Sequence, residues 1–244
     1  MSEPIALVTG ASRGLGLALS RLLIEKGYSV VGITKTKKYW PKALQTTKQK
    51  EKLHLLQADL VSEPQVKKIA AQILKKFKSV EILVNNAGIG GALARVEDLS
   101  LEDYEAMMDS NLKSAFLLSK YLIPQFRKRN RGWIVNISSM AGQRAVPRLF
   151  AYSAAKFGGL ALSQCIAKEN QDKKFKCITV CPGGMNTEMR SELFGKEDAL
   201  KQQSPEYVAH VIRQILEGKI EVQSGGDIVI RHGKITAIHP CPEA

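Results

Sequence analysis

The chain opens on IALVTGASRGLG, residues 5–16, where an apolar run leads directly into a glycine-rich stretch. The run IALVT predicts a buried strand, and helical apolar spacing follows as far as about Lys26. Gly10, Gly14 and Gly16 remove side chains that would keep a phosphate away from the backbone amides at the start of this helix. A tight strand-to-helix turn would also use glycines, but the position of this turn after a first strand favours a nucleotide site.

The rest of the chain alternates short apolar runs with longer helical patterns, which predicts a parallel sheet covered by helices on both faces. The predicted strands are residues 5–9, 29–34, 52–58, 81–86, 133–138, 177–181 and 227–231. The later predicted helices are residues 62–77, 101–129 with an interruption at Pro124, 152–170, and one that begins at Pro205. Residues 182–204 form a looser stretch. We therefore expect an α/β fold, a single-domain doubly wound (Rossmann) parallel sheet of about seven strands, over residues 1–244.

The composition is that of an ordinary globular protein, with 44% hydrophobic and 24% charged residues. The formal net charge is +13, which could serve nucleic acid, an anionic membrane surface or acidic ligands. The lysines are spread over the predicted helices, and no arginine-rich arm is present. We therefore interpret the charge as a solvated surface and do not expect nucleic acid as a partner. No apolar run reaches the ~18 residues of a membrane span.

The cysteines and histidines bear on the cellular compartment of the protein and on whether it binds a metal. Four cysteines form no dense framework, which favours free thiols in a reducing compartment. The start of the chain has neither a basic leader nor an apolar signal region. We expect a cytoplasmic protein, with the mitochondrial matrix left open. The four histidines are scattered, so no metal site is expected.

The end of the second predicted strand distinguishes the two nicotinamide dinucleotides. An NAD site usually carries an acid there for the ribose hydroxyls, whereas this chain has Thr34 and Lys35 and no acid until Glu51. Lys35 and Arg13 could instead neutralise a 2′-phosphate. The sequence therefore favours NADP (NADPH) as cofactor. Asp59, at the end of the third predicted strand, could accept from an adenine amino group or cap the following helix.

The stretch SMAGQRAVPRLFAYSAAK, residues 139–156, carries a candidate proton-transfer group. Tyr152 and Lys156 are four residues apart and share one face of a helix. A free phenol titrates near pH ~10, and a neighbouring ammonium lowers that pKa, as proton transfer at a carbonyl requires. Ser139 follows a predicted strand and could hold a hydroxyl against the substrate oxygen. Asn111, on an otherwise apolar helix face, either satisfies a kink or holds a water.

These motifs together resemble the short-chain dehydrogenase/reductase family, in order and at its spacing: TGASRGLG, ADL, NNAG, the helix asparagine, ISS, YSAAK and PGGMNT. Within the family the chain is most similar to the 3-oxoacyl-[acyl-carrier-protein] reductase type, which implies fatty acid metabolism. The resemblance implies that Tyr152 exchanges a proton with the substrate oxygen and that Ser139 hydrogen-bonds the carbonyl. It also implies that Lys156 lowers the pKa of Tyr152 and holds the nicotinamide ribose, and that Asn111 anchors a water.

The resemblance further implies sets of contact residues. The catalytic residues that the resemblance implies are Asn111, Ser139, Tyr152 and Lys156. The expected cofactor contacts are Gly10, Ser12, Arg13, Gly14, Leu15, Gly16, Thr34, Lys35, Asp59, Leu60, Asn86, Ala87, Gly88, Tyr152, Lys156, Pro182, Gly183 and Thr187. The expected substrate contacts are Ser139, Gln143, Arg144, Arg148 and Tyr152.

The expected partners follow from the same resemblance. The substrate is a small carbonyl compound, either free or carried on coenzyme A or acyl carrier protein. A homo-oligomer, dimer or tetramer, would form through the long helix and the helix that carries Tyr152. The C-terminal sequence GGDIVIRHGKITAIHP differs from the family pattern. A non-catalytic nucleotide-sensing or nucleic-acid-binding protein on the same fold is the alternative function.

Overall fold

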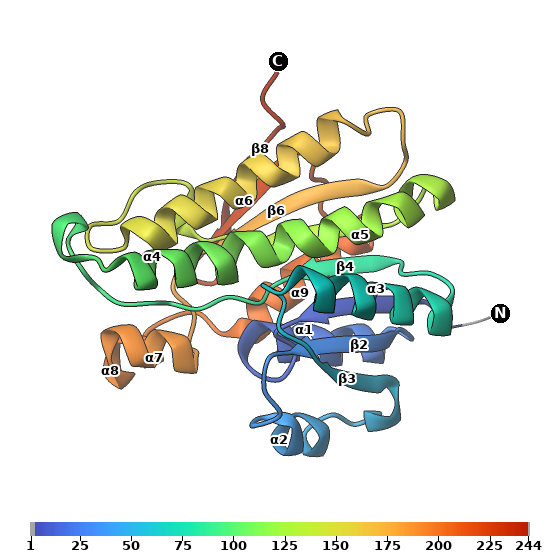
Figure 1. The fold of residues 1–244 in the computed structure, drawn as a ribbon, viewed down its shortest axis with the longest axis horizontal. Coiled ribbons are helices and arrows are strands. Elements are labelled where there is room, and N and C mark those ends of the chain that lie inside the picture. The colour runs from blue at the N-terminus through green and yellow to red at the C-terminus, as the bar shows by residue number, and fades with distance from the viewer. Residues whose placement is uncertain (1–2, 244) are drawn as a thin grey trace.

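The computed structural model describes residues 3–243 and has one sheet covered on both faces by helices (Figure 1). The strands are β1 (Ile5–Thr9), β2 (Ser29–Thr34), β3 (Leu53–Gln57), β4 (Ile82–Asn85), β5 (Trp133–Ile137), β6 (Lys176–Pro182), β7 (Asp227–Arg231) and β8 (Lys234–His239). The α-helices are α1 (Gly14–Glu25), α2 (Trp40–Gln45), α3 (Glu63–Phe77), α4 (Leu101–Met108), α5 (Ser114–Arg129), α6 (Phe150–Lys168), α7 (Glu188–Phe194), α8 (Lys196–Leu200) and α9 (Pro205–Leu216). Short turns of other helix types are η1 (Lys50–Lys52), η2 (Val96–Asp98), η3 (Asp109–Lys113) and η4 (Met140–Gly142).

The sheet has the strand order β3-β2-β1-β4-β5-β6-β7-β8, and β1 to β7 are mutually parallel. The order reverses between β1 and β4, the point at which a doubly wound sheet binds its ligand. The expected doubly wound fold is thus confirmed. Because the strands are parallel, the residues that follow β1, β2, β4, β5 and β6 lie along one edge of the sheet.

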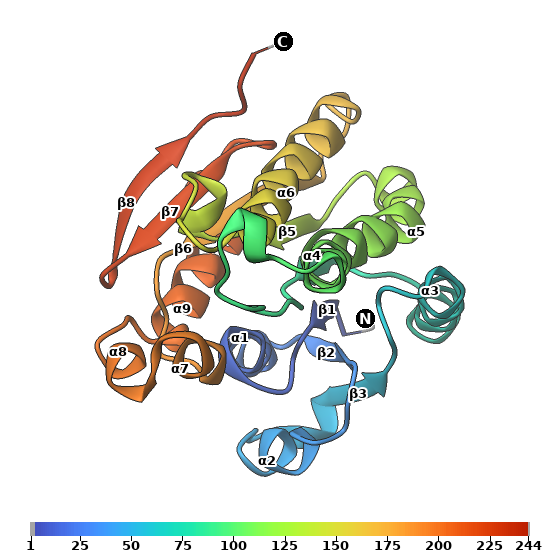
Figure 2. The same ribbon diagram turned by 60° about the vertical axis from the view of Figure 1, so that its left-hand side comes forward.

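The alternation of side chains along each strand divides the core into two layers. In β1, Ala6 and Val8 join the cluster made with α1 and α9, whereas Ile5 and Leu7 join the cluster made with α3, α5 and α6. Figure 2 shows α1 and α9 on one side of the sheet and α3, α5 and α6 on the other. Both faces of the sheet are buried, which explains why the strand sequences are nearly continuous apolar runs.

An eighth strand, β8, was not predicted. It pairs antiparallel with β7 through a two-residue turn in which His232 and Gly233 have φ values of 51° and 68°. Two successive left-handed residues are typical of a tight hairpin turn. β8 is mostly exposed, so its residues show no strong apolar signal. The sheet therefore ends in a hairpin and not in the single last strand that was expected.

The long helix predicted over residues 101–129 is interrupted at a different place. The α-helical pattern gives way to a π-helical turn at Asp109–Lys113, between α4 and α5. The interruption predicted at Pro124 was wrong, because α5 runs through it. Pro124 lies on the exposed face of α5, where water can satisfy the carbonyl that loses its helical partner. The stretch 182–204, expected to be loose, contains α7 and α8.

Candidate active site

The two serines at the end of β5 have different surroundings. The Ser138 hydroxyl is buried and donates to the backbone oxygen of Lys156 at 2.9 Å, which fastens α6 to the sheet. The Ser139 hydroxyl accepts from the backbone amide of Ala141 at 3.1 Å and hydrogen-bonds the Tyr152 side chain. Ser138 therefore has a structural contact, and Ser139 is the hydroxyl next to the candidate proton donor.

Tyr152 lies in the first turn of α6, with its phenol close to Ser139. Burial raises the pKa of Tyr152, and the hydrogen bond with Ser139 opposes that shift. A buried phenol is therefore protonated near neutral pH and can donate a proton to a substrate oxygen.

Lys156 lies one helical turn further along α6 and is buried, with 6% of its surface exposed. Its Nζ donates to the backbone oxygen of Ile137 at 3.0 Å and lies 5.5 Å from the centroid of the Tyr152 ring. Burial lowers the pKa of Lys156 to about 8. The predicted pair thus lies together in the structure. The expectation that Lys156 lowers the pKa of Tyr152 was wrong for the protein without cofactor, because burial raises the pKa of Tyr152 and only Ser139 opposes the shift.

Asn111 lies in the π-helical turn between α4 and α5, with 7% of its surface exposed. Its Nδ2 donates to the backbone oxygens of Ile89 and Met107, each at 3.1 Å. Its Oδ1 is buried and has no hydrogen-bond partner in the described part of the chain. A Cβ at Gly88 would lie 2.3 Å from this Oδ1 and 3.7 Å from Nζ of Lys156. The unpaired oxygen therefore lies beside Lys156, where a water could join the two groups.

Gly88→Ala should lower kcat by about tenfold or more, because the new methyl group must displace the Asn111 amide from this position. Steady-state kinetics at saturating cofactor measure the effect. Gly159→Ala is the matched control, because a Cβ there has no heavy atom within 4 Å, and it should leave kcat within about twofold. A Gly88→Ala enzyme as active as the control would contradict a role for the placement of Asn111.

The glycine turn after β1 leaves no room for side chains. A Cβ at Gly16 would lie 2.3 Å from the backbone oxygen of Gly10, and one at Gly10 would lie 2.9 Å from Nδ2 of Asn86. Gly10 and Gly14 also have positive φ values, 66° and 53°. The Thr9 hydroxyl accepts from the backbone amides of Asn86 and Ala87, each at 2.8 Å. Hydrogen bonds thus hold the glycine turn against the end of β4. The backbone amides of the turn are not covered by side chains, which suits the binding of a dinucleotide phosphate.

The cations expected at the 2′-phosphate carry acidic partners in this structure. Nζ of Lys35 lies 3.1 Å from Oδ2 of Asp59, and Arg13 is paired with Glu188. Asp59 also accepts from the backbone amide of Val61 at 3.2 Å. The alternative in which Asp59 caps the following helix was wrong, because α3 begins after Ser62. Both cations remain substantially exposed, at 41% and 71% of the side chain for Arg13 and Lys35.

The residues after β6 close the other side of the glycine turn. The amide of Gly183 donates to the backbone oxygen of Ile230 at 2.7 Å, which fixes the chain as it leaves the sheet. The Thr187 hydroxyl accepts from the amide of Arg190 at 3.3 Å and so caps α7. Its methyl group would contact a Cβ at Gly14 at 3.5 Å. Thr187 thus lies against the glycine turn.

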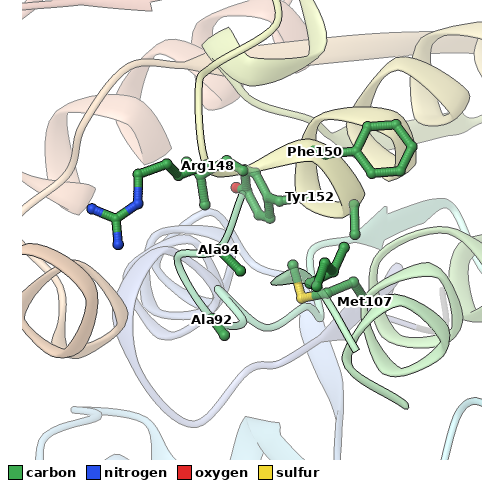
Figure 3. A pocket seen from close by; sticks show the side chains of 9 residues that line it. Ala92, Ala94, Met107, Arg148, Phe150 and Tyr152 are labelled. Carbon is green, nitrogen blue, oxygen red and sulfur yellow. The ribbon is translucent and has the colours of Figure 1, made fainter. Parts of the chain in front are cut away.

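A shallow hollow that is open to solvent adjoins Tyr152. Figure 3 shows Tyr152 from α6 and Met107 from α4 beside it, with the Arg148 guanidinium extending away from Tyr152. The rest of its lining is apolar and comprises Ala92, Ala94, Leu99, Leu149, Phe150 and Ala151. Met107 and Leu99 were not among the predicted substrate residues, since only the fold brings α4 against α6.

The three other predicted substrate residues differ in their contacts. Nε2 of Gln143 donates to Asp227 at 2.6 Å and to Cys181 at 3.3 Å, so this side chain is held by β6 and β7. Arg148 lines the pocket and donates to the backbone oxygen of Leu93 at 3.2 Å. Arg144 is exposed. The Asp227 carboxylate also binds His239 of β8 at 2.9 Å, which ties the C-terminal hairpin to the loop after Ser139.

Residues 3–243 contain no group of three or more His, Cys, Asp or Glu side chains that could hold a metal ion. In the same residues no helix has the length and apolar character needed to span a membrane.

Comparisons with known proteins bear on the family and on the fold of this chain. The family model described as short chain dehydrogenase matches residues 4–198. The NADPH-dependent pterin aldehyde reductase of Arabidopsis thaliana is 32% identical over 211 residues, which cover 86% of each chain. The 3-oxoacyl-[acyl-carrier-protein] reductase FabG of Thermotoga maritima is 28% identical over 242 residues, covering 95% of this chain and 97% of the relative.

Solved structures of other proteins have a similar fold. The structure described as ElxO with NADP bound has a TM-score of 0.84 at 25% identity, covering 93% of this chain and 97% of the other. Levodione reductase has a TM-score of 0.87 at 21% identity, covering 96% and 98%, and supports the fold alone. The fold, the assembled Ser139, Tyr152 and Lys156, and the match over residues 4–198 place this chain in the short-chain dehydrogenase family.

Proposed function

We propose that this protein is an NADPH-dependent reductase that converts a carbonyl group to an alcohol. The observation that carries the proposal is the assembly of Ser139, Tyr152, Lys156 and Asn111 beside the glycine turn. NADPH, when bound, supplies the hydride for the reduction. The Ser139 and Tyr152 hydroxyls hold the substrate oxygen, and Tyr152 gives it a proton as charge develops there.

Lys156 has two tasks in this proposal. Its position on the sheet side of Tyr152 lets the ammonium stabilise the phenolate that remains after the proton has left. Its Nζ lies near the unpaired Oδ1 of Asn111, since both approach the space above Gly88. A water held by Asn111 would return a proton from solvent to this pair.

NADPH is favoured over NADH because the end of β2 carries Thr34 and Lys35 and no acid. A carboxylate there would repel a 2′-phosphate, whereas Lys35 and Arg13 can neutralise it. The names of an NADPH-dependent relative and of an NADP-bound neighbouring structure support this choice.

The residues beside Tyr152 support a substrate class. They are mostly apolar and suit an acyl chain or ring next to a ketone or aldehyde, and the exposed Arg144 could meet an anionic end. A 3-oxoacyl thioester satisfies both features, which would give a role in fatty acid metabolism. Relatives named for a pterin aldehyde and for a 3β-hydroxysteroid add those compounds to the candidates.

The basic cluster Arg127–Arg131 is not proposed as a carrier-protein site, because its arginines have partners within the chain. Arg127 donates to Asn170, and Arg129 and Arg131 pair with Glu81.

The assembly and compartment are part of the proposal. The exposed rings of Phe116 on α5 and Phe157 on α6 support a homo-oligomer, a dimer or homotetramer, that covers these helices. Four free cysteines, two of them buried, support a reducing compartment such as the cytoplasm.

A substrate panel tests the function. NADPH absorbance should fall with at least one of the 3-oxoacyl thioesters, diketones, quinones, steroid ketones or pterin aldehydes, and Ser139→Ala should slow that reaction by about 10²-fold. Ser138→Ala removes a neighbouring hydroxyl that faces the backbone, so it should retain most of kcat even where it costs stability. Absence of NADPH oxidation with every compound would overturn the proposal.

A further inference from the structure

Three segments that are far apart in the sequence meet at Glu188, the first residue of α7. Nη1 of Arg13, from the glycine turn, donates to Oε2 of Glu188 at 2.5 Å. The hydroxyl of Tyr39, from the segment after β2, donates to Oε1 of the same carboxylate at 3.0 Å. The Arg13 guanidinium also lies 4.8 Å from the centroid of the Tyr39 ring. The Glu188 carboxylate therefore makes the shorter of two ion pairs with the arginine expected at the 2′-phosphate, and Glu192 lies farther away at 3.9 Å.

The backbone fixes Glu188 in this place. Thr187, the residue before it, caps α7 and lies against Gly14 of the glycine turn. Figure 2 shows α7 beside the start of α1, which is where Arg13 stands. The backbone therefore places Glu188 next to Arg13, although the Glu188 side chain itself is 46% exposed.

The charge and exposure of the Arg13–Glu188 pair allow a phosphate group to replace Glu188. Hydrogen bonds from Arg13 and then Tyr39 lower the pKa of Glu188, so the carboxylate is ionised at neutral pH. The side chains of Arg13 and Glu188 are 41% and 46% exposed, and an ion pair this accessible contributes little to stability. A phosphate monoester carries a charge of about −1.5 to −2 at pH 7 and is a stronger partner for a guanidinium.

We infer that Glu188 competes with the 2′-phosphate of the cofactor for Arg13 and thereby sets how strongly the enzyme prefers NADPH to NADH. The inference rests on the proposed function, which assigns Arg13 to that phosphate. NADH has no 2′-phosphate and leaves the Arg13–Glu188 pair intact. The 2′-phosphate of NADPH would take the guanidinium as its partner, and Glu188 would keep its hydrogen bond from Tyr39.

The test compares 2′,5′-ADP with 5′-AMP, two probes that differ only in the 2′-phosphate, by titration calorimetry. Glu188→Gln should bind 2′,5′-ADP about three- to fivefold more tightly, the scale of an exposed ion pair. Its affinity for 5′-AMP should not change. Glu192→Gln is the matched control, because it removes the same charge from α7 at 3.9 Å from Arg13, and its gain should be less than half as large.

A double-mutant cycle with Arg13→Ala completes the test. Arg13→Ala should lower the affinity for 2′,5′-ADP, and Glu188→Gln added to it should then give no gain. The inference is overturned if Glu188→Gln changes both probes equally, weakens 2′,5′-ADP binding, or keeps its gain without Arg13. If Arg13→Ala leaves 2′,5′-ADP binding unchanged, the assignment of Arg13 is wrong and the inference fails with it. NADPH turnover by the unaltered protein reports on the proposed function separately.

Discussion

Tyr152→Phe should lower kcat for carbonyl reduction by about 10³-fold, within the range for loss of a general acid. The substitution keeps the ring beside Lys156 and removes only the hydroxyl that hydrogen-bonds Ser139. The dissociation constant for NADPH should rise much less than kcat falls, because the variant keeps the ring and Lys156 and loses one hydroxyl among many cofactor contacts. Stopped-flow turnover and fluorescence titration with NADPH measure the two quantities on one preparation.

Tyr104→Phe is the matched control for this prediction. Tyr104 of α4 stacks on Phe150 with the ring centroids 6.2 Å apart, so the same chemical change is made close to the same pocket. Its kcat should remain within about twofold of the unaltered value. A Tyr152→Phe enzyme that kept more than a tenth of kcat would remove Tyr152 from its role as the proton donor.

Lys156→Met should lower kcat by about 10²-fold or more and at the same time stabilise the fold at pH 7. Burial lowers the pKa of Lys156 to about 8, below the ~10.4 of an unfolded lysine. Below about pH 8 both states hold the proton, and the cost of the buried charge, about 3 kcal/mol, is present in full. The lost hydrogen bond to the Ile137 oxygen offsets about 1 kcal/mol. The variant should thus be about 2 kcal/mol more stable.

The difference in stability between Lys156→Met and the unaltered protein should depend on pH. Between about pH 8 and 10.4 the unfolded chain still binds the proton and the folded chain does not, so the unaltered protein becomes relatively more stable as pH rises. The advantage of Lys156→Met in urea unfolding should therefore shrink over that interval. Lys168→Met, at the exposed end of the same helix, is the control and should show no such advantage. A gain from Lys156→Met that was the same at pH 7 and pH 10 would contradict a buried ammonium.

Much of the fold could be predicted because strands buried on both faces are read directly as apolar runs. The strands around Leu7, Val31 and Val135 were predicted within a residue or so of their bounds. β8 was missed, since an exposed edge strand has no buried face to mark it. The π-helical turn at Asn111 was also missed, because it depends on hydrogen bonds to Ile89 and Met107 and not on a local breaker residue.

The candidate site also combines residues that the sequence could identify with residues that it could not. The glycine turn, Tyr152 and Lys156 have fixed spacings along the chain, so their sequence pattern is informative. Tyr39 and Glu188 are separated from Arg13 by 26 and 175 positions, and no pattern connects them. Asp59 could be read two ways from the sequence, and the start of α3 after Ser62 removed one of them.

The most direct test of the account follows the hydrogen that reaches the product. The enzyme would be given a carbonyl substrate selected from the panel and NADPH with deuterium at the transferring position of the nicotinamide, and the alcohol would be examined by mass spectrometry. We expect one deuterium at the carbinol carbon, and Tyr152→Phe should form this product about 10³-fold more slowly. Oxidation of NADPH with no deuterium in the alcohol, or an equal rate of labelling by Tyr152→Phe, would contradict it.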